Sequence, residues 1–302
     1  MATAQFGRVI TAMITPFTED GAVDYESAVA LAKHLVAHGS EGLLVGGTTG
    51  EGATMTAEEK LKLYTLIVDA VGKRGEGKKV PVMGNIGTIS TADTIAFGNK
   101  AKETGIDCAL VIVPFYVKPN QEGMYQHFTA VAKGVDLPLV LYNVPGRTGV
   151  SIQPETIKRI VDECPNVVGI KDATGSWDQV TKEKALLPED FMIYSGDDAF
   201  TLPVLLAGGV GIISVSAHVI GDDMLAMVEA FEKGDLAKAR ELHLKMYEIN
   251  KGMFFTASPT PVKTATNLVG QPGGHFRLPM VEPTEAEKAK VRQMLENYGG
   301  LL

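Results

Sequence analysis

The chain has 302 residues, of which 45% are hydrophobic and 21% charged, so it contains enough apolar material for a large buried core. Its 36 acidic and 28 basic residues give a formal charge of -8 with no basic cluster, which argues against nucleic acid or an anionic membrane as a partner. Only two cysteines occur and no signal peptide is recognisable, so we expect a reduced, cytoplasmic protein.

Short β-branched runs alternate with longer amphipathic stretches, a pattern typical of strand–helix units around a parallel sheet. In the first helical stretch, apolar residues recur at helical spacing between Asp24, which can cap its start, and Gly39, which can cap its end. We expect eight strands, in chain order RVITAMIT (8–15), GLLVGG (42–47), VPVMGNI (80–86), CALVIVP (108–114), LPLVLYNV (137–144), NVVGIKD (166–172), FMIYSGDD (191–198) and GIISVSA (211–217).

Eight such units ending near residue 234 favour a closed eight-stranded barrel over an open doubly wound sheet. We therefore predict an α/β fold: a (β/α)8 TIM barrel over residues 1–234 with a C-terminal α-helical extension over 235–302, where at least two helical patterns occur. The uncharged segment 201–220 is interpreted as a short helix and a strand, because Pro203 and three glycines interrupt it.

Lys171 stands at the end of the sixth predicted strand, in NVVGIKD. Side chains alternate along a strand, so Lys171 and Gly169 should face the barrel mouth while Val168 and Ile170 face the helices. A desolvated lysine there has a lowered pKa and can attack carbonyls. A structural ion pair with a carboxylate stays equally open from spacing alone, although parity argues against Asp172 as its partner.

Other strand ends also carry polar residues. GGTTGE places Thr48 and Thr49 between glycines, where free amides can hold a carboxylate, but for this motif alone an ordinary hydroxyl-rich turn is the better explanation. Tyr142 can relay protons and Arg147 can bind a carboxylate in bidentate fashion, or they are a packed aromatic and a surface arginine. The GDD at 196–198 either binds a ligand or caps the next helix.

Three motifs together resemble the dihydrodipicolinate synthases of lysine biosynthesis: GTTGE at 47–51, YNVPGRTG at 142–149 and GIKDATG at 169–175. The resemblance runs along nearly the whole chain. It implies a metal-free and cofactor-free lyase in which Lys171 forms a Schiff base with pyruvate, and the resulting enamine condenses with L-aspartate 4-semialdehyde to give 4-hydroxy-tetrahydrodipicolinate in the diaminopimelate route.

The resemblance also implies roles for individual residues. Tyr142 would exchange protons beside the imine, with Thr49 and Tyr116 completing a hydroxyl relay. Tyr116 would act in the site of a neighbouring subunit, within a homotetramer built from tight dimers. The substrate-binding residues carried over are Thr48, Thr49, Arg147, Gly196 and Ile213.

Related enzymes such as N-acetylneuraminate lyase and the keto-deoxy sugar-acid aldolases share the lysine and tyrosine, so they remain alternatives, as does a non-catalytic keto-acid sensor. Arg147 in PGRTG argues for the synthase. Of the positions matching the feedback pocket of lysine-inhibited members, all but Asp93 depart from the polar pattern of those enzymes, so we expect weak or absent inhibition by lysine. These positions are Ala57, Lys60, Ile89, Asp93 and Phe115.

Overall fold

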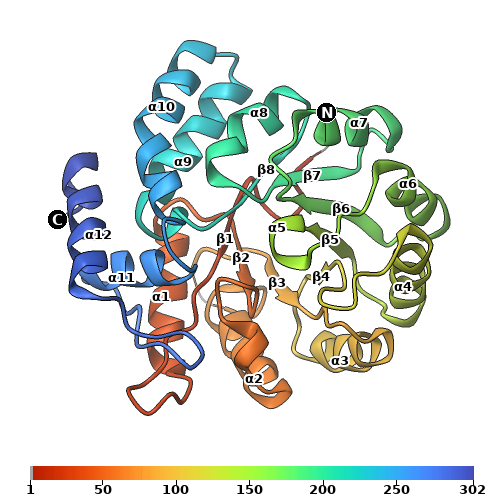
Figure 1. Cartoon of the computed structure of the whole chain (residues 1–302), viewed down its shortest axis with the longest axis horizontal. Coiled ribbons are helices and arrows are strands. Elements are labelled where there is room, and N and C mark those ends of the chain that lie inside the picture. The colour runs from red at the N-terminus through yellow and green to blue at the C-terminus, as the bar shows by residue number, and fades with distance from the viewer. Residues whose placement is uncertain (1–2, 76) are drawn as a thin grey trace.

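The computed structural model describes residues 3–75 and 77–302, and its centre is a closed barrel of eight parallel strands (Figure 1). The strands pair in chain order and β8 pairs with β1 to close the barrel. They are β1 (Val9–Ala12), β2 (Gly42–Val45), β3 (Val82–Asn85), β4 (Cys108–Ile112), β5 (Leu139–Asn143), β6 (Val167–Asp172), β7 (Met192–Ser195) and β8 (Gly211–Ser214). Each lies within a predicted strand segment, so the predicted fold class is confirmed.

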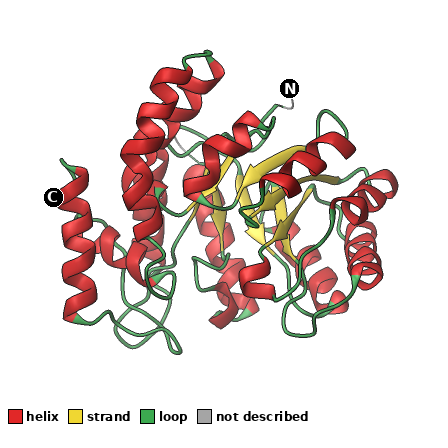
Figure 2. Ribbon diagram, turned by 45° about the horizontal axis from the view of Figure 1, so that its top comes forward, coloured by secondary structure: helices red, strands yellow, loops and turns green. Residues whose placement is uncertain are grey.

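Helices surround the strands on all sides (Figure 2). Local capping sets where several of them begin: the Asp24 side chain accepts the Ser27 amide at the start of α1, and Thr56 forms a capping box with Glu59 at the start of α2. The helices of the barrel are α1 (Tyr25–Ala37), α2 (Ala57–Val71), α3 (Thr91–Glu103), α4 (Gln121–Gly134), α5 (Pro145–Thr148), α6 (Pro154–Glu163), α7 (Trp177–Leu186), α8 (Thr201–Leu206) and α9 (Ala217–Glu232).

The extension consists of α10 (Leu236–Gly252), α11 (Thr260–Leu268) and α12 (Glu285–Tyr298) on one side of the barrel (Figure 1). Helix α10 packs on α9, and α12 packs against α10 and α11. The uncharged segment 201–220 forms α8, β8 and the start of α9, as predicted. Within the described residues, none of the helices has the length and apolar character needed to cross a membrane.

Two apolar cores result from strand alternation. One fills the barrel and includes Leu110, Val140 and Tyr194, and the other lies between the sheet and the helices. Ile170 faces the outer core as predicted, but the prediction for Val168 is wrong, because it packs against the inner core. The cause is an irregularity in β6: its pairing with β5 skips Val168, which breaks the strict alternation.

Candidate active site

The predicted functional residues gather at the carboxyl ends of the strands, the catalytic face of such barrels. Thr48 follows β2, Tyr142 lies in β5 and Lys171 in β6, and β5 and β6 pair directly in the register Tyr142 with Lys171. A cavity of about 350 Å³ opens here and is lined by Thr48, Tyr142, Asn85 and Ile112, among others. Residues from strands far apart in the sequence therefore share one site.

Lys171 is buried, with 5% of its surface exposed, and its Nζ lies 4.5 Å from the centre of the Tyr142 ring. Burial disfavours the ammonium form, and this lowers the pKa of Lys171 to about 8 from 10.5. Gly169, two residues before Lys171, has no room for a side chain, because a Cβ there would come within 2.7 Å of the Met192 carbonyl oxygen. Near neutral pH, part of the Lys171 population therefore carries an uncharged amine, which is the nucleophilic form.

The carboxylate whose charge affects the pKa of Lys171 is Asp198, not the adjacent Asp172. The charge of Asp198 opposes the lowering of the Lys171 pKa. Asp198 is itself held by the Ser214 hydroxyl and by two backbone amides after β8. Asp172 faces away and accepts hydrogen bonds from the amide and hydroxyl of Thr174. The GDD motif was the only sequence signal for Asp198, and its role as an electrostatic neighbour was missed.

Tyr142 is buried, and two polar residues, Arg147 and Thr48, influence the pKa of its hydroxyl. Burial raises the pKa of Tyr142, while the positive charge of Arg147 and a hydrogen bond with the Thr48 side chain oppose that rise. Arg147 lies on the short helix α5 and is exposed, yet it is close enough for its charge to lower the pKa of Lys171 as well. The charge of Arg147 therefore acts on the pKa of both Tyr142 and Lys171.

The turn after β2 is closely packed around Thr48 and Thr49. Thr49 is buried with 5% exposure, and the Glu51 amide donates to the Thr48 carbonyl over 3.0 Å. Gly52 has no room for a side chain, because a Cβ there would lie 1.9 Å from the Gly46 carbonyl oxygen. The turn is thus a buried, tightly packed segment, and its binding of a carboxylate stays a prediction.

The remaining predicted residues occupy different surroundings. Gly196 donates its amide to the Asp172 carbonyl at 2.6 Å, and a Cβ would meet that of Ala173 at 2.7 Å. Ile213 is fully buried in β8, within the inner core. Tyr116, with φ +64° and 86% of its surface exposed, does not line the cavity within this chain, although Phe115 beside it does.

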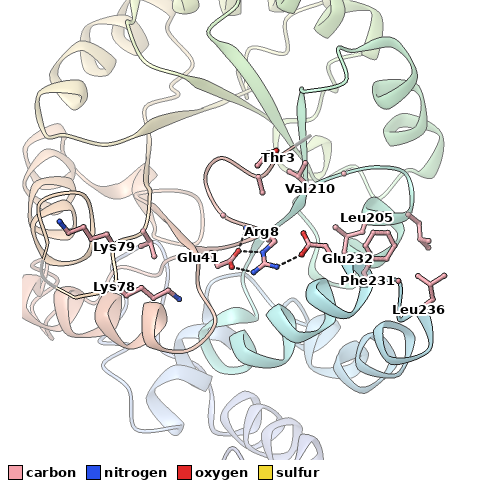
Figure 3. Close-up of a pocket in the computed structure, with 16 residues that line it drawn as sticks. Thr3, Arg8, Glu41, Lys78, Lys79, Leu205, Val210, Phe231, Glu232 and Leu236 are labelled. Atoms are coloured by element: carbon pink, nitrogen blue, oxygen red, sulfur yellow. Dashed lines mark hydrogen bonds and ion pairs between the residues drawn. The ribbon is translucent and has the colours of Figure 1, made fainter. Parts of the chain in front are cut away.

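A larger hollow of about 1040 Å³ lies at the opposite end of the barrel, beside the loops that precede β1, β2, β3 and β8. Figure 3 shows Arg8 there between Glu41 and Glu232, and its guanidinium donates to both carboxylates. These ion pairs already neutralise Arg8. The amino-terminal face of such barrels contributes stability rather than chemistry, so this hollow is not our candidate active site.

The closed barrel and the buried lysine at its mouth define a (β/α)8-barrel enzyme equipped for amine chemistry on a carbonyl. The chain belongs to the dihydrodipicolinate synthetase family, whose family model matches residues 5–298.

Curated relatives match over almost their whole length. A 4-hydroxy-tetrahydrodipicolinate synthase of Heliobacterium modesticaldum is 48% identical over 295 residues, covering 98% of this chain and 96% of the relative. The enzyme of the same name from Thermosynechococcus vestitus is 47% identical, covering 97% and 98%.

Solved structures agree with the family assignment. Dihydrodipicolinate synthase from Cyanidioschyzon merolae, crystallised with lysine bound, superposes with a TM-score of 0.94 at 41% identity, covering 98% of this chain and 99% of that one. A monomeric dihydrodipicolinate synthase variant gives a TM-score of 0.93 at 39% identity, with 98% of each chain covered.

Proposed function

We propose that this chain condenses pyruvate with L-aspartate 4-semialdehyde to give 4-hydroxy-tetrahydrodipicolinate, in the diaminopimelate route to lysine. The observation that carries the proposal is the buried Lys171, whose pKa of about 8 and position 4.5 Å from the Tyr142 ring suit imine formation. Membership of the dihydrodipicolinate synthetase family supplies the choice of substrates.

The chemistry starts when the neutral Nζ of Lys171 attacks the keto carbon of pyruvate and water leaves, which forms the imine. Loss of a methyl proton gives the enamine, whose carbon bonds to the aldehyde carbon of the semialdehyde. The amine of that substrate then attacks the imine carbon, closes the ring and releases Lys171. One water is lost overall, and Tyr142 exchanges the protons, with Thr49 and Tyr116 completing the relay.

Binding of the two carboxylates follows from the residues at the mouth. Thr48, Thr49 and the amides of their turn would hold the pyruvate carboxylate, with Gly196 and Ile213 as further substrate-binding residues. Arg147 would hold the carboxylate of the semialdehyde, because a guanidinium can bind both oxygens at once. Its exposure leaves room for a second substrate to enter.

The alternative aldolases of the superfamily are less well supported. They use the same lysine and tyrosine, so the lysine alone does not decide between them. The charge of Arg147 acts on the pKa of both Tyr142 and Lys171, and this supports a carboxylate-binding role for Arg147 beside the reacting lysine. An exposed arginine elsewhere would have left the choice open.

We also infer an assembly of tight dimers paired into a homotetramer, in the cytoplasm. Support for the dimer comes from an exposed apolar group at the catalytic face, made of Ile89 (43%), Phe115 (36%), Tyr116 (86%) and Val117 (58%). A second chain covering this group would bring Tyr116 to a neighbouring site. Both cysteines are unpaired and buried, which suits a reducing compartment.

The division of the chain into a catalytic barrel (1–234) and a helical extension (235–302) is likewise a proposal. The residues between α9 and α10 lie at this boundary. Because α10 and α11 bury apolar side chains such as Met246 and Val262 in the outer core, we expect the extension to depend on the barrel for folding.

The proposal is tested by two measurements on the purified protein. Coupled turnover of pyruvate with aspartate semialdehyde should exceed turnover of N-acetylneuraminate and keto-deoxygluconate. Pyruvate with borohydride should add one reduced pyruvyl group at Lys171, located by peptide mass spectrometry. Labelling at another lysine, or faster cleavage of either sugar acid, would contradict the proposal.

A further inference from the structure

A lysine of the extension lies fully buried beneath the turn that carries Thr48 and Thr49. Lys263 of α11 has 0% of its surface exposed, and its Nζ donates to Glu51 Oε1 over 2.7 Å and to the His275 carbonyl oxygen over 2.5 Å. The ring of Phe17 lies 4.5 Å from the same nitrogen. A cation from residue 263 is thus held against the GTTGE motif, 212 residues earlier in the chain.

Glu51 connects the ammonium group of Lys263 to the turn that carries Thr48 and Thr49. It is a non-glycine residue in the left-handed region, with φ +53°, a conformation that persists only where surrounding contacts determine it. Its amide closes the turn onto the Thr48 carbonyl, while its side chain points the other way, to Lys263. The carboxylate therefore anchors the same residue whose backbone shapes the turn.

A second link from the extension reaches the next segment. The Arg277 guanidinium donates to both oxygens of Glu59 in α2 and to the Thr54 carbonyl. Its amide also approaches Glu51 Oε2 at 3.4 Å. The extension thereby holds the turn and the helix that follows it at several points.

A buried ion pair of this kind is a poor source of stability, because the cost of removing both charges from water offsets their attraction. Its geometric effect is specific, since a salt bridge with satisfied hydrogen bonds admits few arrangements. We infer that Lys263 and Glu51 are positioning residues that set the turn at Thr48 and Thr49 for the carboxylate of pyruvate. This inference rests on the proposed function, because it requires that turn to hold pyruvate.

Three variants separate positioning from stability. Lys263→Met removes the cation, and Lys263→Met with Glu51→Gln removes both charges, so that no buried charge lacks a partner. Leu295→Ala, in α12, removes a fully buried side chain of the extension and serves as the matched control, because it lies outside the links to the turn.

The measurement is the pyruvate concentration that half-saturates borohydride trapping at Lys171, together with the KM for each substrate and the thermal midpoint. All assays run well below the lowest midpoint of the set. Lys263→Met should raise the half-saturating pyruvate about tenfold, because a small misplacement of a binding group is costly. The KM for the semialdehyde should change much less.

The double variant should recover most of the thermal midpoint but keep the raised pyruvate requirement. Leu295→Ala should lower the midpoint and bind pyruvate like the wild type. Recovery of both midpoint and pyruvate affinity in the double variant would overturn the inference, and so would an equal pyruvate defect in Leu295→Ala. If Lys263→Met fails to fold, the double variant and the single variant Glu51→Gln replace it in the test. Each should then raise the half-saturating pyruvate about tenfold, and wild-type pyruvate affinity in both would overturn the inference. Absence of trapping in the wild type would overturn the proposed function itself, and this inference with it.

Discussion

At the scale of single residues, the chemistry depends on how the barrel treats Lys171. Burial lowers its pKa, Arg147 lowers it further, and Asp198 opposes both. Two opposite charges therefore act on the pKa of Lys171 at the end of a strand, and its protonation near neutral pH is determined by its surroundings rather than by the side chain alone.

The first prediction concerns the pH dependence of imine formation. With a pKa of about 8, the neutral fraction of Lys171 should grow about tenfold per pH unit below 8 and level off above it. The rate of borohydride trapping at limiting pyruvate measures this directly. A rate that is already level between pH 6 and 7, or that still climbs steeply at pH 10, would contradict the environment we describe.

The same lowered pKa has a consequence for stability. The unfolded lysine, at its ordinary value of 10.5, binds more protons than the folded one between pH 8 and 10.5, so the contribution of Lys171 to stability becomes more favourable as pH rises through that window. We expect Lys171→Met to raise the thermal midpoint at pH 7 and to lose that advantage above pH 10.5. A midpoint difference that does not vary with pH would show that folding does not lower the pKa of Lys171.

Arg147 provides a prediction with two readouts. Arg147→Ala should raise the KM for aspartate semialdehyde at least tenfold, because it removes the proposed carboxylate ligand, while pyruvate is still trapped on Lys171. It should also move the pH profile of trapping to higher pH, since the arginine charge lowers the pKa of Lys171. Arg159→Ala, which removes an exposed arginine paired with Glu122, is the control. Unchanged semialdehyde kinetics would return Arg147 to a surface role.

At the scale of elements, the segments α2, the loop after β3 and the loop after β4 meet beside the cavity. Lys60 of α2, Ile89 and Phe115 line the cavity. The Nζ of Lys60 lies 4.6 Å from the Phe97 ring centre, and burial lowers the pKa of Lys60. These side chains offer a positive charge and apolar surface. A basic effector would instead need hydrogen-bond acceptors there.

From these elements we predict weak or absent inhibition by lysine. Ala57, Ile89 and Phe115 have no side-chain polar group to bond the effector, and Lys60 repels its amine, with only Asp93 favourable. Initial rates at saturating pyruvate and increasing lysine test this. Half-inhibition at sub-millimolar lysine would contradict it. Lys60→Ala should make the enzyme more sensitive, because it removes the repulsive charge.

At the scale of the whole molecule, the exposure of Tyr116 predicts that sites are shared between chains. Lys171→Ala and Tyr116→Phe subunits should each have low activity. Mixed and reassembled in equal amounts, random pairing gives hybrid dimers in which one of the two sites carries neither change, so about a quarter of wild-type activity should return. Activity equal to the mean of the separate variants would contradict a tyrosine supplied by the partner.

Much of the fold follows from patterns that are local in the sequence. The eight strands lie where β-branched runs predict them, and strand parity correctly placed Lys171 in the barrel mouth and turned Asp172 away from it. Parity failed at Val168, because the irregular pairing of β6 with β5 is a property of two strands together. The alternation of apolar and polar residues along one strand carries no information about the register in which that strand pairs with its neighbour.

What the sequence by itself determined is therefore the order and type of the elements, the polar residues at the strand ends and the three motifs that indicate the family. Only the tertiary structure decided which charges face Lys171 and which residue of the extension meets Glu51. The physical reason is that burial and pairing depend on distance in space: Asp198 and Lys171 are 27 positions apart (198 − 171), and Lys263 and Glu51 are separated by 212, yet each pair interacts within one low-dielectric interior.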